Sequence, residues 1–444
     1  MSLYPEFSEE YKEKSLEMLE YSLENLGAYA SWRALDPGPT RPPDERYAAL
    51  PALTKNDIRE HFPRGFVPPD KDIEKGLADQ EISFVETSGS SDAIRVTNIW
   101  NQGWWDASEE ASWELNAHAA RLATGSHAEA ILVNARNVGI VSDKEDLPFE
   151  KRRLGRFLYL NEKTDVTAWT PRLMDRMIAE LDIFRPAVLE ANPSFLARLC
   201  RYIYENDKEV YQPGIIVLTY EFPSKIHLRQ VNRVFKNPVV SSYGSTEAGY
   251  VFMQCEAGKF HQNSRSCRVD FQPLKKEHGG PYIGRMLVTT FDNPWYYMLR
   301  FDVGDFAHLD EEQKCECGRR SGFIVSAIEG RWTNVTLTGD GRLVTLNRLD
   351  RAMSQLQDID EYRLEQTAPG TYTLYLVSRR RDRHNLELEA RETLQRVYGH
   401  KAALTIEYPE FITPEDSGKY SLAKTLFPLN IDDYLDKKTV FPVK

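Results

Sequence analysis

The chain has 444 residues, of which 41% are hydrophobic and 11% aromatic, and its formal net charge at pH 7 is −11. This length predicts two or three domains, and the composition predicts globular folding. The excess of acidic over basic residues argues against nucleic acid as the main partner, because nucleic-acid binding needs clustered positive charge. The basic runs at 151–153 and 379–381 are short and lie beside acids, so we interpret them as solvated surface.

The sequence shows neither a membrane span nor a secretion signal. No stretch approaches the roughly 18 consecutive apolar residues that cross a bilayer. The segment Met1–Glu10 lacks the apolar core of a signal peptide. The five cysteines are an odd number and, without a secretion signal, do not predict a disulfide framework. We therefore expect a cytoplasmic protein with no membrane partner.

The predicted elements begin with a helix over residues 9–35 and a proline-rich loop over 37–43. From about residue 82, short β-rich runs alternate with helical ones. The predicted strands are Ile82–Val85, Ala130–Val133, Ala187–Leu189, Ile215–Leu218 and Val239–Val240, and the predicted helices include Pro171–Leu181 and Pro193–Tyr204. Short buried strands separated by helices predict parallel sheets with crossovers, and hence an α/β body.

From about residue 331 the pattern becomes that of a small α+β domain. A helix over 346–356 precedes two strands, 362–366 and 372–377, which a Pro-Gly turn joins. An amphipathic helix ending near Gly399 and a strand over 404–408 complete the domain. We therefore expect a large, multi-subdomain N-terminal α/β body of residues 1–330 and a C-terminal domain of residues 331–444.

Three motifs in the body carry residue types suited to binding a nucleotide. The loop 86–91, rich in Gly and hydroxyl residues, follows a predicted strand and can present N–H and hydroxyl groups to phosphate oxygens. In the segment 242–247, Tyr243 can stack on a purine and Glu247 can hold a hard cation such as Mg²⁺. Asp305 follows a Gly turn and suits the two hydroxyls of a ribose.

Two further motifs lie at the expected domain boundary and in the C-terminal domain. The segment 328–331 ends the body with Ile-Glu-Gly-Arg. Lys419 follows Ser417-Gly418 and can neutralise the charge that develops on a phosphate. Each of the five motifs alone has an ordinary interpretation as a polar loop or a solvated charge. Their occurrence together, in this order and at these separations, is the specific signal.

The five motifs resemble those of the acyl-adenylate-forming superfamily (acyl-CoA ligases, adenylation domains and luciferases), and in particular its phenylacetate–CoA ligase-like branch. The resemblance covers residues from about 50 to 427. It includes Phe184-Arg185-Pro186 and Asn192-Pro193-Ser194, which look like a segment common in that branch. The resemblance implies the adenylate-forming enzyme fold, in which the small C-terminal domain is a mobile lid.

Carried over position by position, the resemblance implies a catalytic set and a nucleotide site. The implied catalytic residues are Lys419, Glu247 and Thr246, with Glu247 also holding Mg²⁺. The residues implied to bind the nucleotide are Thr87, Ser88, Gly89, Ser90, Ser91, Glu221, Tyr243, Gly244, Asp305 and Arg331. Among them, Tyr243 is implied to stack on the adenine, and Asp305 and Arg331 to contact the ribose.

The chain departs from the family pattern in three places. Asp92-Ala93-Ile94 follows the phosphate loop where the family has Gly and Pro, and an acid beside a triphosphate is electrostatically unfavourable. Trp332-Thr333-Asn334 replaces an acidic hinge pair, and the Gly-Ala-Glu turn that lines the adenine keeps only Glu221. Because the implied catalytic residues all remain, we favour an active enzyme.

Cys255, His261, Cys315 and Cys317 form a ligand set typical of structural zinc. The Cys-x-Cys-Gly part is the moderately specific signal, and members of the resembled branch often carry a similar set. Two alternatives stay open, namely reduced surface cysteines without metal, and Cys267 in place of His261 as the fourth ligand. Four protein ligands leave no open position for catalysis, so the predicted metal is structural.

The resemblance implies ATP-dependent activation of an aryl or arylacetic acid to its acyl-AMP, with release of pyrophosphate, followed by transfer to the thiol of coenzyme A. The expected cofactors and partners are ATP, Mg²⁺, structural Zn²⁺, coenzyme A and the small carboxylic acid; a homodimer is left open. Two alternatives remain. The acceptor is a non-thiol group (an amine, a protein or a deazaflavin hydroxyl), or the protein binds nucleotide without turning it over.

Overall fold

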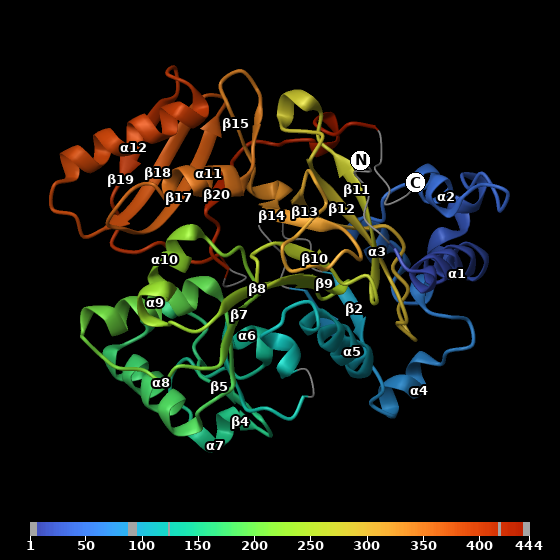
Figure 1. Ribbon diagram of the computed structural model, residues 1–444, viewed down its shortest axis with the longest axis horizontal. Helices are drawn as coiled ribbons and strands as arrows, with labels where there is room; N and C mark the ends of the chain where they lie inside the picture. The colour runs from blue at the N-terminus through green and yellow to red at the C-terminus, as the bar shows by residue number, and fades with distance from the viewer. Residues whose placement is uncertain (1–6, 88–95, 123–124, 416–418, 438–444) are drawn as a thin grey trace. The chain divides into compact units, whose positions relative to one another are not determined.

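The computed structural model describes residues 7–87, 96–122, 125–415 and 419–437 (Figure 1). These residues divide into two compact units, each assembled from segments that are separated in the sequence. The first unit takes its residues from 1–123, 242–328 and 432–444, and the second from 124–241 and 329–431. Both units combine helices with β-sheets, which confirms the predicted α/β class. Within the described residues, no helix is both long enough and apolar enough to cross a bilayer.

The helices of the first unit lie mainly in its N-terminal segment. They are α1 (Glu9–Asn25), α2 (Pro43–Ala49), α3 (Lys55–His61), α4 (Ile73–Ala78) and α5 (Gln102–Trp113). The helix predicted over residues 9–35 is confirmed only in part, because α1 ends at Asn25 and a 3₁₀ helix, η1 (Gly27–Ala34), follows. Leu26 between them is extended and precedes a glycine, a combination that interrupts an α-helix.

The main sheet of the first unit is antiparallel where its register is defined, which the sequence did not predict. Its strand order is β11-β12-β13-β14-β10-β9-β8. The bounds are β8 (Val239–Ser245), β9 (Gly249–Gln254), β10 (Phe260–Gln262), β11 (Cys267–Pro273), β12 (Ile283–Thr290), β13 (Phe301–Leu309) and β14 (Ile324–Arg331). The strand predicted at Ile82–Val85 exists as β1 (Ser83–Glu86), but it pairs antiparallel with β2 (Thr97–Trp100) in a separate two-stranded sheet.

The second unit contains the predicted parallel strands. Its first sheet has the order β8-β7-β6-β3-β5-β4, and β3, β5, β6, β7 and the start of β8 run parallel. The bounds are β3 (Glu129–Leu132), β4 (Arg153–Leu154), β5 (Phe157–Tyr159), β6 (Val188–Ala191) and β7 (Ile215–Leu218). The helices that accompany them are α6 (Ala135–Val138), α7 (Phe149–Arg152), α8 (Pro171–Phe184), α9 (Pro193–Glu205) and α10 (Lys225–Val234).

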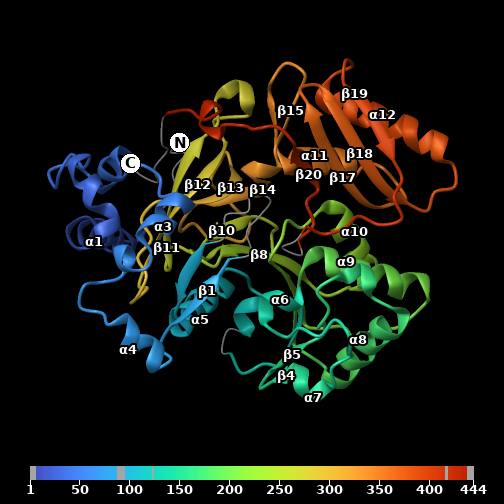
Figure 2. The ribbon, with the colours of Figure 1, turned by 180° about the vertical axis from the view of Figure 1, so that it is seen from behind.

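Two of these helices begin as their sequences predict. Thr170 caps α8 by accepting a hydrogen bond from the Leu173 N–H, and Pro171 occupies the first turn. Pro193 likewise opens α9. The apolar faces of α8 and α9 pack with the parallel strands in one core, and Figure 2 shows these helices beside those strands.

The rest of the second unit is the α+β element predicted from its hairpin pattern. Its four-stranded sheet has the order β19-β18-β17-β20, in which β17 and β18 are antiparallel and the outer pairs are parallel. The bounds are α11 (Leu346–Met353), β17 (Ile359–Ala368), β18 (Thr371–Ser378), α12 (Arg383–Tyr398), β19 (Ala403–Glu407) and β20 (Ala423–Thr425), with β15 (Thr336–Leu337) and β16 (Leu343–Val344) as a small pair. Figure 1 shows α12 along this sheet.

The domain boundary predicted at residue 330 stays a prediction. One junction between the units falls beside it, after Ile328, but the second unit also includes residues from 124–241. The Glu329 carboxylate accepts hydrogen bonds from the Asn347 amide, at 2.9 Å, and from the Thr345 hydroxyl. These bonds fix the end of β14 to the start of α11.

A fully buried carboxylate in the first unit allows a test of the fold. Asp270 accepts hydrogen bonds from Arg268 at 2.9 Å and from Arg300 at 2.8 Å, and all three side chains are buried. Asp270→Asn leaves the buried Arg300 guanidinium without its charged partner, while Arg268 keeps Asp44, and we expect the free energy of unfolding to fall by about 3–5 kcal/mol. The measurement is urea denaturation. The control is Glu114→Gln, which breaks an exposed pair with Arg265 and should cost at most about 1 kcal/mol. Equal losses in the two variants would contradict the expected importance of the buried network.

Candidate active site

The β8–β9 hairpin of the first unit carries the motif that contains Tyr243 and Glu247. The strand is longer than predicted, so Tyr243, Gly244 and Ser245 lie within β8. Gly244 faces β9 so closely that a Cβ atom there would lie 2.3 Å from the Gly249 carbonyl oxygen. Gly249 has a φ of +69°, which favours glycine. The hairpin therefore requires glycine at residue 244, and that requirement fixes the backbone on either side.

Tyr243 and Asp305 come together although they are distant in the sequence. The Tyr243 hydroxyl donates a hydrogen bond of 2.9 Å to the Asp305 carboxylate. Both side chains are half-buried. Asp305 lies on β13 directly after Gly304, whose φ is +84°. Two of the residues predicted to bind the nucleotide thus form one polar pair in the first unit.

Glu247 lies in the turn between β8 and β9, next to the half-buried Thr246, and is itself 5% exposed. Its Oε1 atom is buried and has no hydrogen-bond partner among the described residues. A buried carboxylate oxygen without a partner is costly. A bound hard cation such as Mg²⁺ is a group that would satisfy it. The residue present therefore fits the predicted magnesium site.

Glu221 and Lys419 lie in the second unit. The Glu221 carboxylate accepts hydrogen bonds from the backbone N–H of Ser194 at 2.7 Å and of Tyr420 at 3.5 Å. Burial raises the pKa of Glu221, and the Ser194 and Tyr420 donors and the charge of Lys419 partly oppose that rise. Lys419 is half-buried, and its carbonyl accepts a hydrogen bond of 2.9 Å from the Glu415 N–H. The lysine-bearing segment is thus tied to the turn after β7.

The remaining predicted nucleotide residues are placed as follows. Arg331 is the last residue of β14 and is half-buried. Thr87 is buried, and its hydroxyl lies 3.4 Å from both the backbone nitrogen and the carbonyl oxygen of Val96. This hydroxyl therefore already has hydrogen-bond partners in the backbone. Ser88, Gly89, Ser90 and Ser91 lie outside the described residues, as does Asp92.

The four predicted zinc ligands gather in the first unit. One ligand atom from each of Cys255, His261, Cys315 and Cys317 lies within 4.8 Å of the others. The Cys255 and Cys315 sulfurs are 3.5 Å apart, and the Cys317 sulfur is 3.3 Å from His261 Nε2. Ligands on one tetrahedral zinc would be separated by about 3.8 Å for two sulfurs and about 3.6 Å for sulfur and nitrogen. The observed spacing and the donor types therefore fit the metal.

The electrostatics of this cluster also suit a cation. Burial lowers the pKa of His261 to about 4, so the imidazole is neutral at pH 7 and free to act as a ligand. For Cys317, burial works to raise the pKa, but hydrogen bonds from Arg319 outweigh it and lower the pKa. Cys267, the alternative fourth ligand, is not a member of this cluster. Its thiol donates a hydrogen bond of 3.6 Å to the Asn263 carbonyl.

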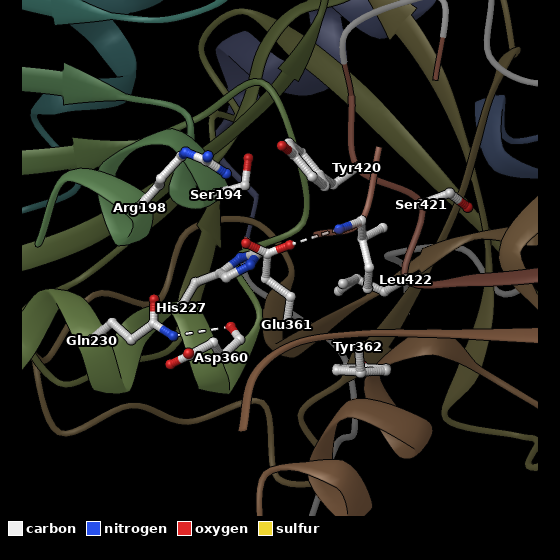
Figure 3. Close-up of a pocket in the computed structure, with 11 residues that line it drawn as sticks. Ser194, Arg198, His227, Gln230, Asp360, Glu361, Tyr362, Tyr420, Ser421 and Leu422 are labelled. Carbon is white, nitrogen blue, oxygen red and sulfur yellow. Dashed lines mark hydrogen bonds between the residues drawn. The ribbon is translucent and has the colours of Figure 1, made fainter. Parts of the chain in front are cut away.

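Sequence reasoning missed a polar cavity in the second unit (Figure 3). Ser194, Arg198, His227 and Tyr420 line it, together with residues of β17. The sequence spacing of these residues could have indicated the cavity. Ser194 and Arg198 are four residues apart on α9, and His227 and Gln230 are three apart on α10, so each pair shares a helix face.

Comparison with solved structures finds this fold in CoA ligases and in an amide bond synthetase. A 2-hydroxyisobutyryl-CoA ligase, in the postadenylation state with an acyl-AMP, matches with a TM-score of 0.68 at 16% identity, over 94% of this chain and 88% of that one. An anthranilate-CoA ligase with anthranoyl-AMP matches with a TM-score of 0.52 at 11% identity, over 85% and 74%. The amide bond synthetase McbA of Marinactinospora thermotolerans gives 0.51 at 12% identity, over 91% of each chain. The chain thus has the fold of the acyl-adenylate-forming superfamily, as predicted.

The sequence matches known proteins less extensively. Over 259 residues the chain is 24% identical to the protein CapK of Staphylococcus aureus. The match takes in 55% of this chain and 54% of CapK, so the chain spans about half the length of the curated relative that it matches. No family model matches the chain.

We expect protein purified without added metal to contain about one zinc per chain, held by the four clustered ligands. Elemental analysis measures this. His261→Ala should lose the metal, because it removes one ligand of the set. Cys267→Ser is the matched control and should keep it. Metal-free protein whose thiols all titrate freely in the native state would rule out the site.

Proposed function

We propose that this protein activates a carboxylic acid, aryl or arylacetic, with ATP to give the acyl-AMP and pyrophosphate, and then transfers the acyl group to the thiol of coenzyme A. The observation that carries the proposal is the hairpin turn of the first unit. There an unpartnered buried carboxylate oxygen of Glu247 lies four residues beyond Tyr243, which is bonded to Asp305. Such an arrangement, on a fold shared with acyl-adenylate-forming ligases, supports a nucleotide site.

In this proposal each residue acts on a different part of the nucleotide. Tyr243 offers its ring to the adenine, and Asp305, with Arg331, hydrogen-bonds the ribose. Thr246 and Glu247 lie toward the α-phosphate, where Glu247 holds Mg²⁺ and the ion supplies positive charge. The substrate carboxylate attacks the α-phosphorus, the bond to pyrophosphate breaks, and the Lys419 ammonium stabilises the charge that grows on the phosphate oxygens.

The second half-reaction needs a thiol in place of Lys419. The C-terminal domain then acts as a lid that withdraws the lysine, and the coenzyme A thiol attacks the acyl carbon and releases AMP. A neighbouring structure, the 2-hydroxyisobutyryl-CoA ligase with its acyl-AMP and coenzyme A, supports the thiol as acceptor. The likeness to an amide bond synthetase keeps an amine as the alternative acceptor.

A carboxylate-dependent ATP–pyrophosphate exchange assay over a panel of aryl, arylacetic and aliphatic acids tests the activity. Exchange with at least one acid supports adenylation, and its absence across the panel contradicts it. Adding coenzyme A or an amine to the active mixture and identifying the thioester or amide by mass spectrometry decides the acceptor.

Lys419→Ala should separate the half-reactions. Because the ammonium stabilises charge only while the acyl-AMP forms, we expect a loss of adenylation of about a hundredfold or more, as for removal of one oxyanion-stabilising donor. Thioester formation from supplied acyl-AMP should stay close to wild type. The control is Lys236→Ala, an exposed lysine after α10 whose ammonium bonds the carbonyls of Asn232 and Arg233. Equal loss of both half-reactions in Lys419→Ala would exclude the lid.

Glu247 and Asp305 should give different kinetic losses. Glu247→Gln weakens a group that acts most in the transition state, so kcat should fall more than the KM for ATP rises. Asp305→Asn weakens a ribose contact that is equal before and during reaction, so it should act mainly on KM, by about 1.5–3 kcal/mol. Tyr243→Phe is the control for Asp305, because it removes the hydroxyl bonded to Asp305 and keeps the ring. Wild-type kinetics in both acid variants would refute the nucleotide site.

A further inference from the structure

The polar cavity of the second unit has room for about one water molecule, about 10 Å³. One wall consists of helices α9 and α10, with Ser194 and Arg198 on the first and His227 on the second. The opposite wall consists of Glu361 on β17 and of the segment that begins one residue after Lys419. Figure 3 shows Tyr420 and Glu361 of this wall turned toward the side chains of the helical wall.

Two side chains on the helical wall have a buried polar atom with no hydrogen-bond partner among the described residues. These atoms are Arg198 Nη1 and His227 Nδ1. The Ser194 hydroxyl lines the same cavity and also bonds the Glu221 carboxylate. Ser194 is 8% exposed and His227 is 5% exposed. An unsatisfied buried polar atom costs about 1–3 kcal/mol. Two such atoms around one cavity, with a serine hydroxyl beside them, indicate a built receptor for a hydrogen-bonding group.

Tyr420 is the residue of the opposite wall that can serve this receptor. Burial and the charge of Glu361 raise the pKa of its hydroxyl, and the charge of Arg198 acts against that rise. In Figure 3 the Tyr420 hydroxyl points to the side of the cavity where Ser194 and Arg198 lie. A phenol both donates and accepts hydrogen bonds, so it can satisfy a guanidinium and a serine hydroxyl, with a water molecule reaching His227.

The backbone around Tyr420 is fixed on both sides. Its N–H donates to Glu221, as described above. The next carbonyl, that of Ser421, accepts a hydrogen bond of 2.9 Å from Arg363 of β17, and the Leu422 carbonyl accepts one of 3.0 Å from the Leu364 N–H. The hydroxyl end of Tyr420 is the part of this side chain that faces the helical wall (Figure 3).

We propose that Ser194, Arg198 and His227 form a receptor for the Tyr420 hydroxyl that holds Lys419 in its adenylating position. All four are positioning residues, because they act through the neighbouring lysine. The inference rests on the proposed function, in which Lys419 serves the first half-reaction only. A small anion is a poorer occupant, since the carboxylates of Asp360 and Glu361 line the same cavity and its volume suits a single water.

Two variants test the receptor. Tyr420→Phe removes only the hydroxyl, and Arg198→Met removes the charge and keeps the stem. In each we expect the kcat of adenylation to fall about tenfold, the effect of losing one positioning contact of about 1.4 kcal/mol. Thioester formation from supplied acyl-AMP and coenzyme A should be unchanged. Tyr202→Phe on the same helix is the matched control, because its hydroxyl bonds Asp175 at an exposed site, and it should leave both half-reactions unchanged.

A second measurement does not depend on catalysis. Hydrogen exchange of the backbone amides of residues 420–423 should speed up in Tyr420→Phe and Arg198→Met and stay at the wild-type rate in Tyr202→Phe. Equal loss of both half-reactions, or unchanged adenylation together with unchanged amide exchange, overturns the receptor. If the wild-type protein shows no pyrophosphate exchange with any acid, the proposed function fails, and the amide exchange alone decides the receptor.

Discussion

In the second unit a single carboxylate, that of Glu221, joins the start of α9 to the segment after Lys419. A helix start offers backbone N–H groups that lack partners inside the helix, and Glu221 takes the one at Ser194. Its other oxygen takes the N–H of Tyr420. The turn that presents Glu221 is not glycine-rich. Tyr220 has a φ of +72°, a conformation that costs a non-glycine residue roughly 1–2 kcal/mol, and its hydroxyl bonds Glu190. The Tyr220 side chain thus anchors this turn through a hydrogen bond of its own.

The residues predicted to act on the nucleotide are divided between the two units. Glu247, Tyr243 and Asp305 belong to the first, where the Tyr243 hydroxyl bonds Asp305 and Glu247 lies in the turn that follows β8. Glu221, Arg331 and Lys419 belong to the second, where hydrogen bonds of backbone and carboxylate fix the lysine-bearing segment. Such a division suits a reaction in two steps, because one set of residues can stay with the nucleotide while the other changes its role.

Much of the second unit could be predicted from the sequence, because its strands are short runs of apolar residues between helices. Ile215–Leu218 is found with the predicted bounds, and Pro171 and Pro193 open their helices. The antiparallel sheet was not predicted, because strands such as β12 are buried on both faces and show no alternation of polar and apolar residues. The parallel interpretation of residues 82–85 failed because their partner, β2, follows a segment that carries no strand pattern.

The candidate site was predictable only through residue types. The four side chains of the candidate zinc site could be named because thiols and imidazoles have few other reasons to recur at such spacing. The Tyr243–Asp305 bond joins residues 62 positions apart, and a pattern within a short stretch of sequence cannot predict such a contact. The cavity of Ser194, Arg198 and His227 was missed for the same reason, since its fourth member, Tyr420, comes from a separate segment.

The close approach of Gly244 to β9 also bears on how this protein's descendants would diverge. A side chain at residue 244 would collide with the backbone of Gly249, so selection for folding alone keeps the glycine, whether or not the protein turns over a substrate. Glu247 is under no such steric demand, and a buried acid without a partner is a burden that a protein without catalysis would shed. In a descendant without the proposed activity, we expect Gly244 to be retained because the fold requires it, and Glu247 to be replaced first.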